Sequence, residues 1–106
     1  MLIEFREYTC HPGKREAWVT LMHDVIVPFQ SSLGVVVLGM WVSESDPNLF
    51  YWMRRFDSEE ARVQIYKAVY ESERWKNELL PLVQAHIDRS VIKSTRIIPT
   101  SRSVMQ

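Results

Sequence analysis

Alternating polar and aromatic side chains in two short segments of the sequence are the strongest candidates for binding chemistry. Residues 2–9 and 49–56 are rich in β-branched and aromatic types; the first supplies Glu4, Arg6 and Tyr8 at alternate positions, and the second supplies Trp52 and Arg54. Alternate residues of a β-strand point to the same side of a sheet. An arginine that faces an enclosed cavity binds a carboxylate or enolate oxygen through its fork of N–H donors. These five residues are therefore candidates for lining a ligand cavity.

A simpler interpretation of Glu4 and Arg6 is that they form ion pairs between subunits at the rim of such a cavity. Most charged side chains in proteins are partnered or solvated, and few are catalytic. We favour this interpretation over a ligand role for the two residues. The sequence identifies no catalytic residue.

Trp75 and His86 add two more cavity candidates from the second half of the chain. They are eleven residues apart, and eleven steps of a helix return to within about 20° of the starting direction. Both side chains therefore lie on one face if the segment is helical. A histidine whose ring is bonded within the end of a core helix is the simpler interpretation of His86.

Several familiar kinds of site have no counterpart in this sequence. There is no glycine-rich phosphate loop, no His/Glu spacing for zinc, no serine nucleophile elbow and no Asp-rich calcium loop. Cys10 and His11 are adjacent at the end of an expected strand, so their side chains point in opposite directions. They are therefore poorly placed to act together as a nucleophile and its general base. Thirteen Lys and Arg balance thirteen Asp and Glu, so the charge footprint of a nucleic-acid binder is missing. We expect no metal, no cofactor and no nucleic-acid partner.

The hydrophobic periodicity predicts the elements that would position these residues. Strands are predicted at residues 2–9, 35–42, 49–56 and 91–98, from their β-branched and aromatic content and the turns that bound them. A helix is predicted from Lys14 to about Phe29, with Ala17, Trp18, Leu21, Met22, Val25 and Phe29 on its apolar stripe. A second helical region is predicted from Asp57, the expected N-cap, as two pieces with a restart near Leu80, because Pro81 interrupts a continuous helix. The order is β-α-β-β-α-β, a ferredoxin-like α+β fold with a four-stranded antiparallel sheet.

Both faces of the expected sheet are apolar, which has a consequence for assembly. In the third strand Phe50, Trp52 and Phe56 alternate with Leu49, Tyr51 and Met53; in the second, Val36, Leu38, Met40 and Val42 alternate with Val35, Val37 and Trp41. Helices can cover only one face of such a sheet. A second copy packed face to face hides the other. We predict a homodimer whose two sheets enclose a shared interior.

The spaced motifs of the chain resemble those of the NIPSNAP family. They are Glu4 to Thr9, His11 to Lys14, Trp18, Gly39 to Glu44, Trp52 to Ser58, Trp75 and Arg96 to Pro99. The resemblance implies a dimeric α+β barrel, a fold shared with antibiotic-biosynthesis-type and haem-degrading monooxygenases. In haem-degrading relatives of that fold a helix histidine binds iron beside a tryptophan, an arrangement to which Trp75 and His86 are only loosely similar. The strand-one asparagine of those enzymes is absent here.

Three functions are compatible with this sequence. The first is a homodimeric barrel that binds a small apolar or aromatic metabolite without converting it. The second is a cofactor-independent or haem-dependent monooxygenase that uses the same cavity. The third is a dimerising interaction module whose interior is filled by side chains. A cavity of at least about 300 Å³ would favour the first two over the third.

Length and composition indicate one domain. With 106 residues, 46% of them hydrophobic and 25% charged, the chain matches a single globular core. We expect the domain at residues 1–100 and a polar tail at 101–106. No export signal begins the sequence and no apolar run reaches the roughly 20 residues of a membrane span, so we expect a cytoplasmic protein.

Overall fold

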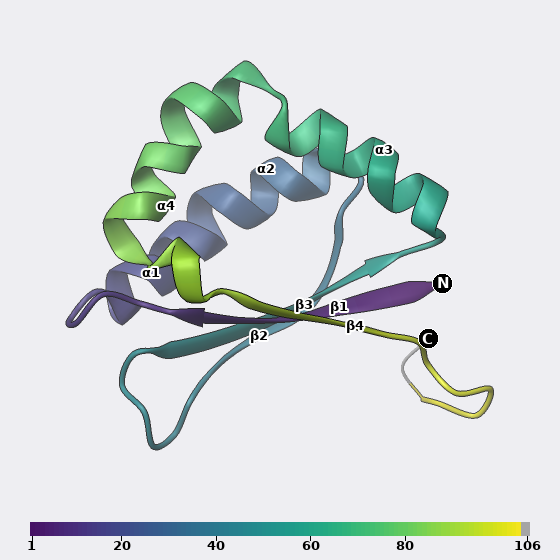
Figure 1. The fold of residues 1–106 in the computed structure, drawn as a ribbon, viewed down its shortest axis with the longest axis horizontal. Coiled ribbons are helices and arrows are strands. Elements are labelled where there is room, and N and C mark those ends of the chain that lie inside the picture. The colour runs from purple at the N-terminus through teal and green to yellow at the C-terminus, as the bar shows by residue number, and fades with distance from the viewer. Residues whose placement is uncertain (105–106) are drawn as a thin grey trace.

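The computed structural model describes residues 1–104 and contains a four-stranded antiparallel sheet with helices on one side (Figure 1). The strands are β1 (Leu2–Thr9), β2 (Val36–Val42), β3 (Leu49–Phe56) and β4 (Lys93–Ile97). The helical elements are α1 (Arg15–Leu21), η1 (Met22–Ile26), α2 (Val27–Ser32), α3 (Glu59–Tyr70), η2 (Trp75–Leu79), α4 (Leu80–His86) and η3 (Arg89–Val91). The strand order is β2-β3-β1-β4, so the predicted ferredoxin-like α+β fold is confirmed.

The strand boundaries follow the sequence closely except at the end of the chain. β1 and β3 have the predicted limits, whereas β4 is shorter than the predicted 91–98. The reason is the 3₁₀ turn η3, which Asp88 caps by accepting a hydrogen bond from the Ser90 N–H at 3.0 Å. Met105 and Gln106 of the predicted tail lie outside the described residues.

Two prolines inside the helices are each preceded by a π-helical turn. The residue before Pro28, Val27, donates its N–H to the Met22 carbonyl five residues back; Leu80, before Pro81, does the same to Trp75. A proline has no N–H and its ring clashes with the carbonyl four residues earlier, so the wider turn relieves both problems. The α-helix therefore restarts at Leu80 as predicted, without breaking at Pro81.

The widened turn also changes which residues of the first helical run are buried. Trp18, Met22, Ile26 and Gln30 point inward at a constant spacing of four. A regular α-helix would have buried Val25, as the apolar stripe predicted, but the π turn rotates the following residues. Its effect is to bring the polar Gln30 into the interior.

The second helical region is two pieces, and its N-cap differs from the prediction. α3 ends at Tyr70, and the run formed by η2 and α4 follows a turn at residues 71–72. The N-cap is Ser58 and not Asp57: the Ser58 hydroxyl accepts from the Ala61 N–H at 3.0 Å. A side chain reaches the N–H three residues on only from the cap position itself.

A bulge in β2 overturns the predicted alternation of that strand. The register passes from Val37 opposite Arg54 to Gly39 opposite Met53, so Leu38 is the extra residue. Val37 therefore shares a face with Met40, and Val36 shares the other face with Trp41. The predicted alternation of β3 is confirmed, since Phe50, Trp52, Arg54 and Phe56 are buried and the odd positions are half-buried.

The helices cover one face of the sheet, and the main hydrophobic core lies between them and it (Figure 1). Trp18, Met22, Phe50, Trp52, Trp75 and Leu79 are among the core residues. No element of the described chain covers the opposite face in the same way, and we call that face the open face (Figure 1). Its exposed apolar side chains include Phe5, Val36, Trp41 and Ile97.

Candidate functional site

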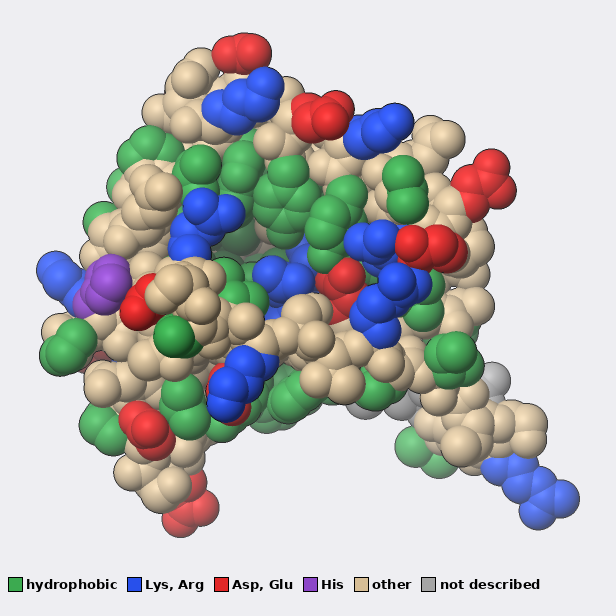
Figure 2. Space-filling view, viewed as in Figure 1, with side chains coloured by type: hydrophobic (Ala, Val, Ile, Leu, Met, Phe, Trp, Pro, Cys, Tyr) green, Lys and Arg blue, Asp and Glu red, His purple; other side chains and the backbone are tan. Residues whose placement is uncertain are grey.

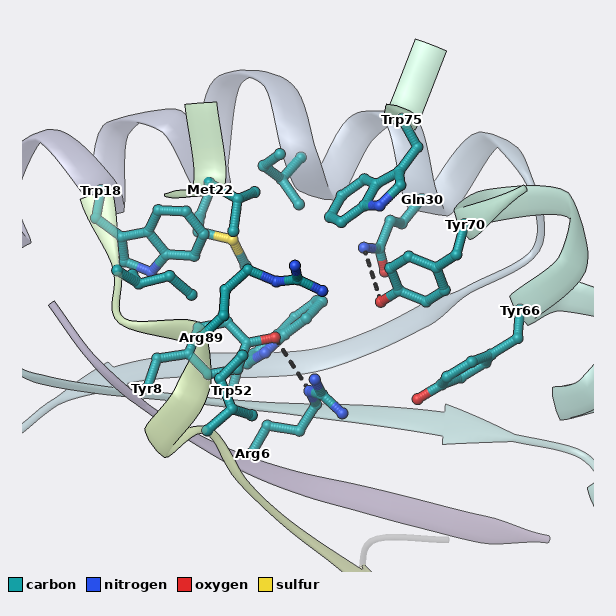
Figure 3. Close-up of a pocket in the computed structure, with 14 residues that line it drawn as sticks. Arg6, Tyr8, Trp18, Met22, Gln30, Trp52, Tyr66, Tyr70, Trp75 and Arg89 are labelled. Atoms are coloured by element: carbon teal, nitrogen blue, oxygen red, sulfur yellow. Dashed lines mark hydrogen bonds between the residues drawn. The ribbon is translucent and has the colours of Figure 1, made fainter. Parts of the chain in front are cut away.

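A pocket lies between the sheet and the helices and is hollowed into the surface of a single chain (Figures 2 and 3). Its volume is about 220 Å³. The lining is mainly aromatic and aliphatic, from Tyr8, Trp18, Met22, Ile26, Trp52, Tyr66, Tyr70, Trp75, Val83, Ile87 and Ile92, with Arg6, Gln30 and Arg89 as its other polar members. The pocket is therefore on the helix-covered side, not in the interior expected between two open faces.

Four of the seven candidate residues line this pocket. Arg6, Tyr8 and Trp52 reach it from neighbouring strands, and Trp75 reaches it from the helical layer. Arg6 lies opposite Trp52 in the β1–β3 register, which explains why two segments 46 positions apart contribute to one wall. Arg6, Tyr8 and Trp52 occupy even positions of their strands, and the side chains at these positions point to the covered face.

Arg54 lies behind the pocket wall and is fully buried. Its guanidinium donates to Glu4 Oε1 at 2.6 Å and to the Tyr66 hydroxyl at 2.7 Å through Nη2. Through Nη1 it donates to the Tyr70 hydroxyl at 2.8 Å and to Gln30 Oε1 at 2.9 Å. A buried charge is tolerated when it is paired and its donors are satisfied, and four partners meet that requirement at both terminal nitrogens. Arg54 therefore organises the wall and does not itself face a ligand.

Glu4 is the carboxylate of this buried cluster. It is 2% exposed and accepts from Tyr66 as well as from Arg54, with the Tyr66 hydroxyl 2.6 Å from Oε2. Arg6 is 4.0 Å and Arg62 is 3.9 Å from its oxygens. The ion pairs of Glu4 thus lie within one chain, in place of the pairs between subunits that we favoured from the sequence.

Tyr66 is held in its neutral form by the cluster. Burial, with a further contribution from the hydrogen bond to Glu4, raises the pKa of Tyr66 to about 12, against the opposing effect of Arg54. Its hydroxyl consequently donates to the carboxylate and accepts from the guanidinium. Arg62, which lies 3.9 Å from Glu4, also forms a closer ion pair with Glu59, at 2.8 Å.

His86 does not line the pocket. Its Nδ1 lies 2.7 Å from the Leu82 carbonyl one turn earlier, and its ring packs at a tilt against that of Trp18, with ring centroids 6.2 Å apart. This is the bonded histidine at a helix end that was the simpler interpretation. The described residues contain no group of three or more His, Cys, Asp or Glu placed to hold a metal ion.

Cys10 is buried and unreactive in this setting. Burial raises the pKa of its thiol to about 11, and nearby Arg15 only partly opposes that effect. The Arg15 guanidinium is occupied by backbone carbonyls, among them that of Asp46 at 2.8 Å. These hydrogen bonds from Arg15 hold the loop between β2 and β3 in place.

The sequence interpretation missed several residues of the pocket and its wall, namely Trp18 as a lining residue, Gln30, Tyr66, Tyr70 and Arg89. Tyr66 and Tyr70 are spaced by four on one helix, so their shared direction was open to prediction. Gln30 was not, because only the π turn brings it inward. Arg89 begins the turn η3, just before the predicted strand at 91–98, in a segment to which the sequence assigned no element.

The architecture and the pocket define an α+β ferredoxin-like domain with a site between sheet and helices. A comparison with protein families matches the NIPSNAP family over residues 3–103. The chain therefore belongs to the NIPSNAP family, as its motifs indicated. Among curated proteins, none matches this sequence.

Solved structures of the family share the fold over nearly the whole chain. A NIPSNAP family protein of unknown function from Agrobacterium tumefaciens is 25% identical, with a TM-score of 0.87 over 100% of this chain and 94% of that one. An uncharacterised NIPSNAP domain protein from Burkholderia xenovorans is 16% identical, with a TM-score of 0.83 over 96% and 97%. An antibiotic biosynthesis monooxygenase is 18% identical, with a TM-score of 0.67 over 94% and 99%, and shares the fold. No helix among the described residues is long and apolar enough to cross a membrane.

Proposed function

We propose that this chain is a binding protein for a compact, mainly apolar aromatic ligand, held in the pocket between the sheet and the helices. The observation that carries the proposal is the pocket itself, whose walls are mostly aromatic and aliphatic and which opens to the surface (Figure 2). Ligand sites in proteins combine such walls with a few polar groups that orient the ligand.

The volume of the pocket limits the size of the ligand. At about 220 Å³ it is below the roughly 300 Å³ that we set for a metabolite-sized ligand, so the pocket by itself does not exclude the interaction module. It exceeds the roughly 150 Å³ of an engineered apolar cavity that accommodates benzene. A single aromatic ring with a short substituent therefore fits, and a ligand of three fused rings does not.

Binding without conversion is favoured over turnover. Among the described residues that line the pocket, none is His, Cys, Asp or Glu. Glu4 lies behind the wall, where Arg54 and Tyr66 occupy its oxygens. General base catalysis needs an accessible group that can take a proton near the working pH. Oxygen consumption with a panel of hydroquinones tests turnover directly, and a rate that falls in Arg6→Ala would support the monooxygenase instead.

We also propose that the chain works as a homodimer joined through its open faces. Phe5 and Tyr51 stack there with ring centroids 5.8 Å apart, beside Trp41, which is 45% exposed. Four strands of about seven residues give a flat face of about 450 Å² before side-chain relief is counted, more than half of the roughly 800 Å² per partner of a specific interface. A second copy matches this surface because its own open face has the same shape and needs the same cover.

The size limit gives the sharpest test of ligand binding. We expect tryptophan fluorescence, which reports on the three pocket tryptophans Trp18, Trp52 and Trp75, to change saturably with one-ring ligands. Calorimetry should give the same order of affinities, and anthracene derivatives of equal charge should not bind. If one-ring compounds fail to bind, or three-ring ones bind better, the pocket is not the ligand site that we propose. Native mass spectrometry of the purified protein checks for a co-purifying ligand.

A further inference from the structure

The buried cluster behind the pocket uses up the hydrogen-bond acceptors of the wall. Glu4 accepts from Arg54 and from Tyr66. The Gln30 carbonyl oxygen accepts from Arg54 at 2.9 Å, which turns the amide nitrogen of Gln30 toward Tyr70. Buried polar groups must be satisfied, so these acceptors stay with their partners in the folded protein. A ligand in the pocket therefore meets few side-chain acceptors.

Several hydrogen-bond donors of the same wall have no partner among the described residues. The Tyr8 hydroxyl accepts from Arg6 at 3.0 Å, and the Tyr70 hydroxyl accepts from Arg54 at 2.8 Å. Each hydroxyl carries one further hydrogen to donate. The indole N–H groups of Trp18 and Trp52, both 1% exposed, have no partner among the described residues. An unpaired donor is costly, and the indole nitrogens have no accessible surface for a ligand to contact, so the two hydroxyl hydrogens are the donors that favour an occupant with acceptors.

The charges around the pocket also favour a ligand that carries acceptors, because they are mainly positive. Arg6 reaches the pocket from β1 and Arg89 from the turn η3, and both side chains point into it (Figure 3). Arg6 is 4.0 Å from Glu4, whose nearer partner is Arg54 at 2.6 Å. Arg89 has no ion pair among the described residues. Arg6, Arg54 and Arg89 thus bring three guanidinium groups to the pocket and its wall, where Glu4 pairs with the first two, and the positive excess lies on the pocket side.

We propose that the ligand of this pocket is an aromatic carboxylate. The inference rests on the proposed binding function and adds the chemical class of the ligand. The carboxylate lies between Arg6 and Arg89, where its two oxygens accept charge-assisted hydrogen bonds, and the ring packs against Trp52 and Trp75. A neutral amide of the same shape offers one carbonyl acceptor and no charge, so it pairs with the two guanidinium groups less well than a carboxylate does.

The test compares matched probes on the full chain. Benzoate and phenylacetate are titrated by calorimetry at pH 7 beside benzamide and phenylacetamide, which have the same shape without the charge. We expect the carboxylates to bind at least tenfold more tightly and to lose affinity as the salt concentration rises, because screening weakens exposed charge pairs. Equal affinities for acids and amides overturn the carboxylate assignment but leave the proposed binding function standing. Binding of neither acids nor amides overturns both.

A pair of variants separates the pocket charge from the overall charge. Arg89 is exposed and has no partner to lose, so Arg89→Gln should fold normally and bind benzoate at least tenfold more weakly, with benzamide unchanged. Arg74→Gln removes the same charge from the outer surface of the helical layer and should leave both affinities as they are. An equal loss in both variants, or no loss in Arg89→Gln, overturns the assignment.

Discussion

The two faces of the sheet distribute polarity in opposite ways, although the same strands form both. On the covered face, β1 and β3 bury the charged side chains Glu4 and Arg54, which are 2% and 0% exposed. On the open face, the same strands present Phe5 and Tyr51, and β2 leaves Trp41 45% exposed. Folding alone favours the reverse arrangement, because burial of charge is costly and burial of aromatic surface is favourable. The covered face is thus built around a buried polar cluster, whereas the open face leaves aromatic surface exposed, which is why we propose that a second copy covers it.

Removal of the buried carboxylate should break the covered face. In Glu4→Gln the Arg54 guanidinium loses its nearest anion while it remains buried, which costs about 3–5 kcal/mol of the free energy of unfolding. Denaturant unfolding measures the loss. Glu44→Gln, an exposed change of the same kind, should cost almost nothing. If both variants lose equally little, the cluster does not hold the covered face together.

A charge placed on the open face should break the proposed dimer and leave the fold intact. Trp41→Glu removes the most protruding aromatic of that face and sets like charges against each other across the two copies, at a cost of about 2 kcal/mol or more in association. Sedimentation should show a shift to monomers at micromolar concentration. Leu82→Asp, on the exposed side of α4, is the control and should leave the association unchanged. A wild-type chain that sediments as a monomer at this concentration would rule out the proposed dimer.

Filling the pocket should distinguish it from the packed core around it. In Val83→Phe the larger ring enters the 220 Å³ space, so stability should change by less than about 1 kcal/mol while one-ring ligands no longer bind. Val69→Phe enlarges a buried residue that does not line the pocket and should cost about 1–3 kcal/mol through overpacking. Thermal unfolding and calorimetric titration of both variants check the contrast. An equal loss of stability in the two would mean that the pocket is already filled.

The smallest effect concerns an ion cluster at the edge of the covered face. Hydrogen bonds from Arg62, and then the charge of Arg62 and Arg96, lower the pKa of Glu59 to about 2. Because the folded pKa lies below the unfolded value near 4.5, the stabilisation is complete above that value and is lost as the pH falls toward 2. The melting temperature of Glu59→Gln should therefore lie slightly below that of the wild type at pH 6 and converge with it at pH 2. A difference that persists at pH 2, or grows there, would contradict this assignment.

Local signals accounted for the elements and for part of the site. The turns and β-branched runs placed β1 and β3 at their observed limits, and strict alternation grouped Arg6 with Tyr8 on one strand and Trp52 with Arg54 on the other. The register of the two strands then puts both groups on one face. Strand order followed from the element order, because the ferredoxin-like connection is one of few that this order permits. These features depend on neighbours in the sequence, where a single periodicity decides direction.

Tertiary structure alone decided the remaining features. The bulge at Leu38 and the π turn before Pro28 each insert one residue into a regular pattern. In the strand that shift reverses the side to which the following side chains point, and in the helix it rotates their direction around the axis. The partners of Glu4 come from residues up to 62 positions away, so no local pattern could tell a pair within the chain from one between subunits. Sequence by itself thus determined which side chains share a strand face. The packing of the helices on that face decided which of them became a buried cluster and which line a pocket.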